Sequence, residues 1–161
     1  MRLAAAILAF FFLIAPGLVP GVSAAPNFPA LTGRVVDDAH ILSDTTKQDM
    51  TQKLAALEAK TSRQLIVVTL PSLQGYEISD YGYQLGRAWG IGQAKLNNGV
   101  LFIIAPNEHR TRIEVGYGLE PIVTDALSSI IIQTKVLPAF RKGDFNAGVV
   151  AGTDALIEQL S

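Results

Sequence analysis

The residues that could carry chemistry in this sequence are mainly oxygen donors. Cysteine is absent, which excludes thiolate catalysis, cysteine zinc sites and iron–sulfur clusters. Four carboxylates and one amide stand near predicted strand ends or helix starts: Asp37, Asp38, Asn98, Glu114 and Asp125. Calcium is bound by about 6–8 such oxygens, and magnesium also prefers them. The set predicts a divalent-metal site for Ca2+, with Mg2+ as the alternative, although it forms no EF-hand loop.

Each of these acids also has an ordinary structural explanation. Asp125 can complement the N-terminus of a helix, and either residue of the pair Asp37-Asp38 can cap a turn. Glu114 can form an ion pair with Arg112 or Arg34. The sequence leaves both explanations open.

The most regular part of the chain is a predicted β-hairpin. Gly99 to Ala105 is almost unbroken apolar sequence, which is typical of a strand covered on both faces. Pro106 to His109 is rich in turn formers, and Arg110 to Val115 alternates apolar and polar residues. Strands joined by so short a connection are antiparallel, so the end of the second lies beside the start of the first. Glu114 and Asn98 are therefore expected at the same end of the hairpin.

The remaining segments alternate between helix and strand patterns. A short strand at 34–36 precedes a helix capped by Ser43 or Asp44, and a buried strand follows at Gln64–Leu70. Further helices are predicted around 78–89, from Thr124 to a stop at Pro138, and from Asp144 onward. This order predicts an α/β fold: a three-layer α/β/α sandwich with a small mixed sheet and a central β-hairpin.

The direction of the first strand decides whether the acids meet. Strands 64–70 and 99–105, connected through a helix, should be parallel. An antiparallel first strand would bring Asp37 and Asp38 to the same rim as Glu114. A parallel one would place them at the opposite end of the sheet.

The first 24 residues predict a cleavable signal peptide. Arg2 precedes an apolar run from Leu3 to Ala15, and Val22-Ser23-Ala24 fits a cleavage site after Ala24. The run is shorter than the roughly 20 residues that span a bilayer, which disfavours an uncleaved anchor. We therefore expect a periplasmic or secreted protein, with an extended lead-in at 25–32 and one folded domain at 33–161.

Composition narrows the choice of partners. The chain has 13 Lys and Arg against 14 Asp and Glu, without a basic run, so no nucleic-acid partner is expected. After the leader no stretch is long and apolar enough to span a membrane, so the mature chain is expected to have no transmembrane segment and to be a monomer. An envelope protein is the partner class that fits export.

The chain resembles the TPM domain family, which is common in bacterial envelope proteins. The resemblance rests on four segments spread over the chain: GRVVDDA at 33–39 with Leu42-Ser43, WGIG at 89–92, NGVL at 98–101, and IEVGYGLE at 113–120 with Thr124-Asp125. It implies the α/β fold and, in some members, divalent-metal binding, mainly of calcium. Some members are described as acid phosphatases.

Two functions follow from these observations. The first is a calcium-binding interaction module of the cell envelope, whose acidic rim holds an ion beside a partner-binding surface. The alternative is a metal-dependent acid phosphatase in which Arg34 or Arg112 clamps the phosphate. The sequence has no Gly-x-Ser-x-Gly elbow and no Cys-x5-Arg loop, so it names no catalytic residue.

Overall fold

The computed structural model describes residues 24–161; the predicted signal peptide falls, except for Ala24, outside the described residues. One sheet has the strand order β1-β2-β3-β4. Its strands are β1 (Val35–Asp37), β2 (Gln64–Thr69), β3 (Gly99–Ala105) and β4 (Arg110–Val115). The first three are parallel, and β4 runs antiparallel to β3 as the predicted hairpin requires.

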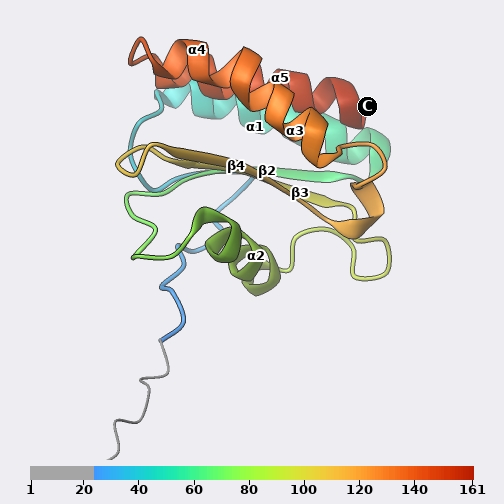
Figure 1. Ribbon diagram of the computed structural model, residues 1–161. Helices are drawn as coiled ribbons and strands as arrows, with labels where there is room; N and C mark the ends of the chain where they lie inside the picture. The colour runs from blue at the N-terminus through green and yellow to red at the C-terminus, as the bar shows by residue number, and fades with distance from the viewer. Residues whose placement is uncertain (1–23) are drawn as a thin grey trace, which may run out of the picture.

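Helices cover both faces of this sheet. They are α1 (Asp44–Thr61), α2 (Ile78–Trp89), the 3-10 turn η1 (Tyr117–Leu119), α3 (Asp125–Ile131), the π-helical η2 (Ile132–Val136), α4 (Leu137–Phe140) and α5 (Phe145–Leu160). Figure 1 shows α2 alone below the sheet and the other long helices above it. The predicted three-layer α/β/α sandwich is confirmed.

The predicted helix ends are determined by local capping. The side chains of Ser43, Thr124 and Asp144 each accept a hydrogen bond from a backbone N–H in the first turn of α1, α3 and α5. At the other end of α2, Gly90 adopts the left-handed conformation of a C-cap.

The continuous apolar sequence of β3 reflects burial on both faces. Alternate residues such as Phe102 and Ile104 join a core with α1 and α5, while Leu101 and Ile103 pack with Tyr81 of α2. A strand with a helix layer on each side has no solvent face, so a polar residue would be costly at any of its positions.

The expected helix stop at Pro138 is wrong. The chain stays helical through Pro138 to Phe140, with the π-helical segment η2 immediately before it. Pro138 lies in the first turn of α4 and has no N–H, so it leaves a backbone acceptor without its usual helical bond. The widened π turn accommodates that loss without ending the helix.

The direction of β1 separates the predicted acids. Asp37 pairs with Thr69 at the carboxyl end of β2, whereas Glu114 pairs with Leu101 near the start of β3. Because β1 is parallel to β2 and β3, the acidic pair lies at the opposite end of the sheet from Glu114. The shared rim that an antiparallel β1 would have created is not formed.

The contacts of the lead-in and the length of the helices complete the description of the fold. The lead-in before β1 is extended and lies along α2, where the Tyr81 hydroxyl donates to the Asn27 carbonyl at 3.1 Å and Trp89 Nε1 donates to the Pro29 carbonyl at 2.9 Å. Within residues 24–161, no helix has both the length and the apolar character needed to cross a bilayer.

Candidate functional site

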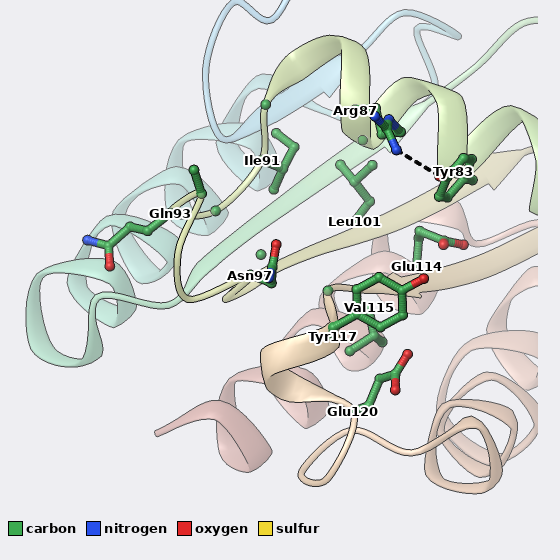
Figure 2. Close-up of a pocket in the computed structure, with 16 residues that line it drawn as sticks. Tyr83, Arg87, Ile91, Gln93, Asn97, Leu101, Glu114, Val115, Tyr117 and Glu120 are labelled. Carbon is green, nitrogen blue, oxygen red and sulfur yellow. Dashed lines mark hydrogen bonds between the residues drawn. The ribbon is translucent and has the colours of Figure 1, made fainter.

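A groove of about 580 Å3 opens between α2 and the end of β4. We call it the α2–β4 groove. Figure 2 shows Tyr83 and Arg87 on its helical side and Glu114, Tyr117 and Glu120 on the other. Its floor includes Leu101, from the central strand. The groove exists because α2, the only helix of residues 24–161 on this face of the sheet, leaves the end of the edge strand β4 uncovered.

Glycines in α2 bring the helix close to the sheet. A Cβ at Gly82 would lie 2.6 Å from Ile103 Cδ1 and 3.7 Å from Glu114 Oε2. One turn later, Gly86 lines the groove, and its Cβ would meet only Leu101 Cδ1, at 3.4 Å. The helix therefore rests on the sheet at Gly82 and leaves open space at Gly86.

The end wall of the groove is built by backbone packed on backbone. The loop 91–98 lies against the turn after β4, where Gly116 N donates to Gly99 O at 2.8 Å and Gly118 N donates to Asn97 O at 3.1 Å. A Cβ at Gly118 would stand 1.9 Å from the Leu96 carbonyl oxygen, so only glycine fits there. The glycines of the WGIG, NGVL and GYG segments thus shape the wall.

The groove carries both charge and exposed aromatic surface. Arg112 Nε donates to Glu114 Oε2 at 2.6 Å, and Arg87 Nη1 donates to the Tyr83 hydroxyl at 2.9 Å. Tyr83 is 48% exposed and Tyr117 is 75% exposed. Such side chains offer apolar area with a polar end, as in many protein-binding surfaces.

Asn98, predicted as a metal ligand, is a structural bridge. It is buried, its Oδ1 accepts from Gln93 N at 2.7 Å, and its Nδ2 donates to the Ser62 carbonyl at 2.7 Å. The amide therefore ties the end of α1 to the loop that forms the groove wall. Glu114, which was expected at the same end of the hairpin, is held by Arg112, as one of the structural explanations anticipated.

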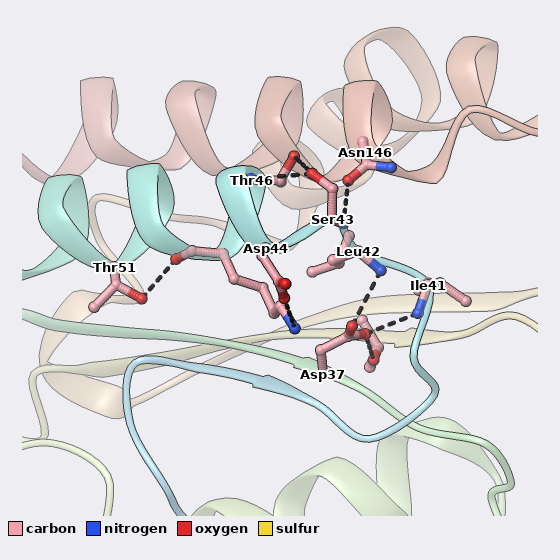
Figure 3. Close-up of polar contacts among 10 residues, drawn as sticks. Asp37, Ile41, Leu42, Ser43, Asp44, Thr46, Thr51 and Asn146 are labelled. Atoms are coloured by element: carbon pink, nitrogen blue, oxygen red, sulfur yellow. Dashed lines mark hydrogen bonds and ion pairs between the residues drawn. The ribbon is translucent and has the colours of Figure 1, made fainter.

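Asp37 closes the turn between β1 and α1 (Figure 3). Its Oδ1 accepts from the Thr69 hydroxyl at 2.6 Å and from Ile41 N at 3.1 Å, and its Oδ2 accepts from Leu42 N at 3.1 Å. Both carboxylate oxygens are thus engaged within the protein.

Asp38 and Asp125 are exposed and lie apart from the groove. Asp38 is close enough to Tyr81 to add to the effect of burial, and together they raise the pKa of that phenol to about 12. Asp125 stands in the first turn of α3, on the sheet face opposite α2. Among residues 24–161, no three His, Cys, Asp or Glu side chains are grouped as metal ligands would be. The structure therefore does not bring the five predicted residues together around one position.

The two arginines predicted for phosphate binding flank opposite edges of the sheet. Arg34 directly precedes β1 and pairs with Glu58 at 2.8 Å, while Arg112 lies in β4 and pairs with Glu114. A given phosphate could therefore contact only one of the two. Sequence reasoning did not assign Tyr83, Arg87 or Glu120 to a site; the one available signal was that Tyr83 falls outside the apolar stripe of its helix.

Comparison with solved structures supports the fold. The N-terminal domain of a protein from P. gingivalis matches with a TM-score of 0.75 and 36% identity, covering 80% of this chain and 82% of that one. The N-terminal domain of cg2496 from Corynebacterium glutamicum matches with a TM-score of 0.63 and 20% identity, covering 86% of both chains. BA42 from Bizionia argentinensis matches with a TM-score of 0.63 and 21% identity, covering 74% of this chain and 81% of that one.

Comparison with curated protein sequences gave no match. The family model of the TPM domain matches residues 35–159, which include every strand and most of the last helix. The segments that carried the resemblance fall within or beside this range, and the glycines of WGIG, NGVL and IEVGYGLE form the wall of the α2–β4 groove. The chain belongs to the TPM domain family.

Proposed function

We propose that this TPM domain is a binding module of an exported envelope protein, and that the α2–β4 groove holds a segment of a partner protein. One observation carries the proposal. The described residues expose five large apolar side chains, Leu31, Tyr83, Leu96, Tyr117 and Ile130. Tyr83 and Tyr117 line the groove, and Leu96 lies in the loop that forms its wall. Apolar surface gathered at one concave place is typical of an interaction site.

The charges of the groove favour a particular kind of segment. Glu114 and Glu120 lie on one side and Arg87 on the other, so the groove presents both signs. An extended segment with an apolar or aromatic anchor between the tyrosines and a basic residue near Glu120 would match this lining.

Tyr117→Ala and Ile130→Ala form a matched pair for testing the groove. Both side chains are large, apolar and mostly exposed, at 75% and 57%, but Ile130 lies on α3, away from the groove. A photo-crosslinking residue placed at 117 or at 130 would be used to capture envelope proteins, and the captured partner would then be titrated against both variants. We expect capture from position 117 and at least about tenfold weaker binding by Tyr117→Ala only. Equal capture and equal affinity at the two positions would remove the groove from the proposal.

The five predicted residues lie at separate places in the fold, so our proposal does not include a calcium site made of all five. From this geometry we expect the melting temperature of the mature domain to be the same in millimolar calcium and in chelator. A rise of several degrees with calcium would reveal a site built from other groups.

The described residues give the phosphatase alternative no particular support. Arg34 and Arg112 are each held in an ion pair at separate edges of the sheet. Phosphatase turnover that disappears in Arg112→Ala, while the fold is kept, would reopen that alternative.

A further inference from the structure

The strand β4 is an edge of the sheet, and its outer side offers unpaired backbone groups. Gly116 N donates to Gly99 O, and this bond sets the alternation of the β3–β4 ladder. In an antiparallel pair every second residue points its N–H and C=O away from the neighbour. In β4 these residues are Thr111, Ile113 and Val115. No hydrogen bond within residues 24–161 reaches their outward backbone groups.

An edge of this length can pair with a further strand. β4 has six residues and β1, the other edge, has three. Natural proteins that avoid edge pairing often place charges or proline on the edge strand. β4 has no proline. Its charged residues Arg112 and Glu114 flank Ile113, so two copies of the strand that run antiparallel about Ile113 bring each Arg112 opposite a Glu114. Ile113 is 5% exposed with its side chain in the core, so it would contribute its backbone.

We propose that two copies of this chain pair through β4, antiparallel and centred on Ile113, to form one continuous eight-stranded sheet. This register joins the outward groups of Ile113 to those of its counterpart, and those of Thr111 to those of Val115. It places Arg112 of each copy opposite Glu114 of the other, twice in one interface. Cross-strand pairs of opposite charge stabilise a sheet, and like charges directly opposite destabilise it.

The neighbouring positions raise no conflict in this register. Arg110 comes opposite Gly116, which has no side chain. Arg112 and Glu114 are partly exposed in the single chain, at 37% and 21%, so both can exchange their mutual bond for bonds across the interface. A register centred on Arg112 or on Glu114 also pairs outward backbone groups with each other, but it sets two arginines or two glutamates directly opposite. The charges therefore favour the Ile113-centred register.

The pairing would also extend the groove. The two-fold axis is perpendicular to the sheet, so both α2 helices lie on the same face. Arg110 shares the face of Arg112 and Glu114 by the alternation of the strand. Arg110 of the second copy would then stand beside Gly116, close to Tyr117 and Glu120 of the groove. We propose this dimer in place of the expected monomer, and the proposal does not depend on what the groove binds.

A charge exchange tests the interface. Arg112→Glu sets Glu against Glu in the homodimer, and Glu114→Arg sets Arg against Arg. Mixed together, the two variants restore opposite charges at both contacts. Native mass spectrometry and sedimentation of the mature domain should show a wild-type dimer, a dissociation constant raised about 10–100-fold in each variant alone, and a heterodimer in the mixture.

Two controls make the same charge changes elsewhere. Arg141→Glu after α4 and Glu77→Arg before α2 alter exposed residues outside β4 and should leave the dimer intact. A wild-type chain that stays monomeric to about 1 mM, or variants that associate as the wild type does, would overturn the proposal.

Backbone exchange supplies a readout that needs no variant. The amide protons of Thr111, Ile113 and Val115 should exchange more slowly as the concentration of the wild-type chain rises, while those of β1 do not change. Exchange at these three amides that is independent of concentration would refute the interface even if the charge variants failed to fold.

Discussion

Replacing Asp37 by alanine should destabilise the domain by about 3 kcal/mol. The carboxylate accepts three hydrogen bonds, from the Thr69 hydroxyl at 2.6 Å and from Ile41 N and Leu42 N at 3.1 Å each. Hydrogen bonds to a charged group contribute about 1.5–3 kcal/mol each, and water can replace part of that in a half-buried turn. For a domain of this size the loss corresponds to a melting temperature lower by about 12 °C.

The assay is urea unfolding followed by circular dichroism and by the fluorescence of Trp89, the only tryptophan of the chain. Asp38→Ala is the matched control: the same change one residue later, at an exposed side chain, is expected to cost less than about 0.5 kcal/mol. Asp37→Asn should lose about half as much as Asp37→Ala, because its amide nitrogen meets a backbone donor.

A double-mutant cycle measures the coupling between Asp37 and Thr69, and calcium and chelator show whether a metal contributes to it. Thr69→Val removes the buried hydroxyl that donates to Asp37, and the two substitutions together should show a coupling energy of about 1 kcal/mol. All these losses should be equal in calcium and in chelator. A cost below about 1 kcal/mol for Asp37→Ala, or a cost that appears only with calcium, would refute the structural role of this carboxylate.

Three further predictions concern the groove and its supports. Gly118→Ala should destabilise the domain by more than about 2 kcal/mol because its Cβ would stand 1.9 Å from the Leu96 carbonyl oxygen. Gly33→Ala, at a position with open space around it, is the control and should change stability by less than about 0.5 kcal/mol; chemical denaturation measures both. Asn98→Asp keeps an acceptor for Gln93 N but sets a carboxylate against the Ser62 carbonyl, so we expect a loss of about 2 kcal/mol, and unchanged stability would contradict the bridging role. Tyr81 has a folded-state pKa of about 12 against an ordinary value near 10, so the protonated phenol stabilises the fold below pH 10 and this contribution is lost as the pH rises to 12. Tyr81→Phe should lower the free energy of unfolding by about 1 kcal/mol at pH 7 and flatten its decline above pH 10. Parallel curves of unfolding free energy against pH for the two proteins would disprove the shift.

The binding proposal and the dimer proposal depend on different residues, so they can be tested separately. The groove needs Tyr117 at its rim, and the strand interface needs Arg112 and Glu114 on β4. Tyr117→Ala should therefore weaken partner binding without changing the dimer. Arg112→Glu should dissociate the dimer at micromolar concentration, so the two results can be told apart.

The sequence alone was sufficient for the elements and for their order in the layers. The apolar run of β3 and the alternation of β4 depend on burial at each successive residue, which local periodicity records. Caps such as Ser43 and Thr124 act within one helical turn, so they too are readable from the sequence. Pro138 misled the prediction because a π turn upstream changed which backbone groups needed partners.

The tertiary structure decided where the chemistry lies. β1 has only three residues, and its direction follows from how it pairs with β2, a contact between segments about 30 residues apart. That single direction sends Asp37 and Asp38 away from Glu114. The groove likewise depends on which face α2 covers and on glycines that let distant backbones touch. Side-chain type and spacing specify which groups are present, but the pairing of remote strands determines which of them become neighbours.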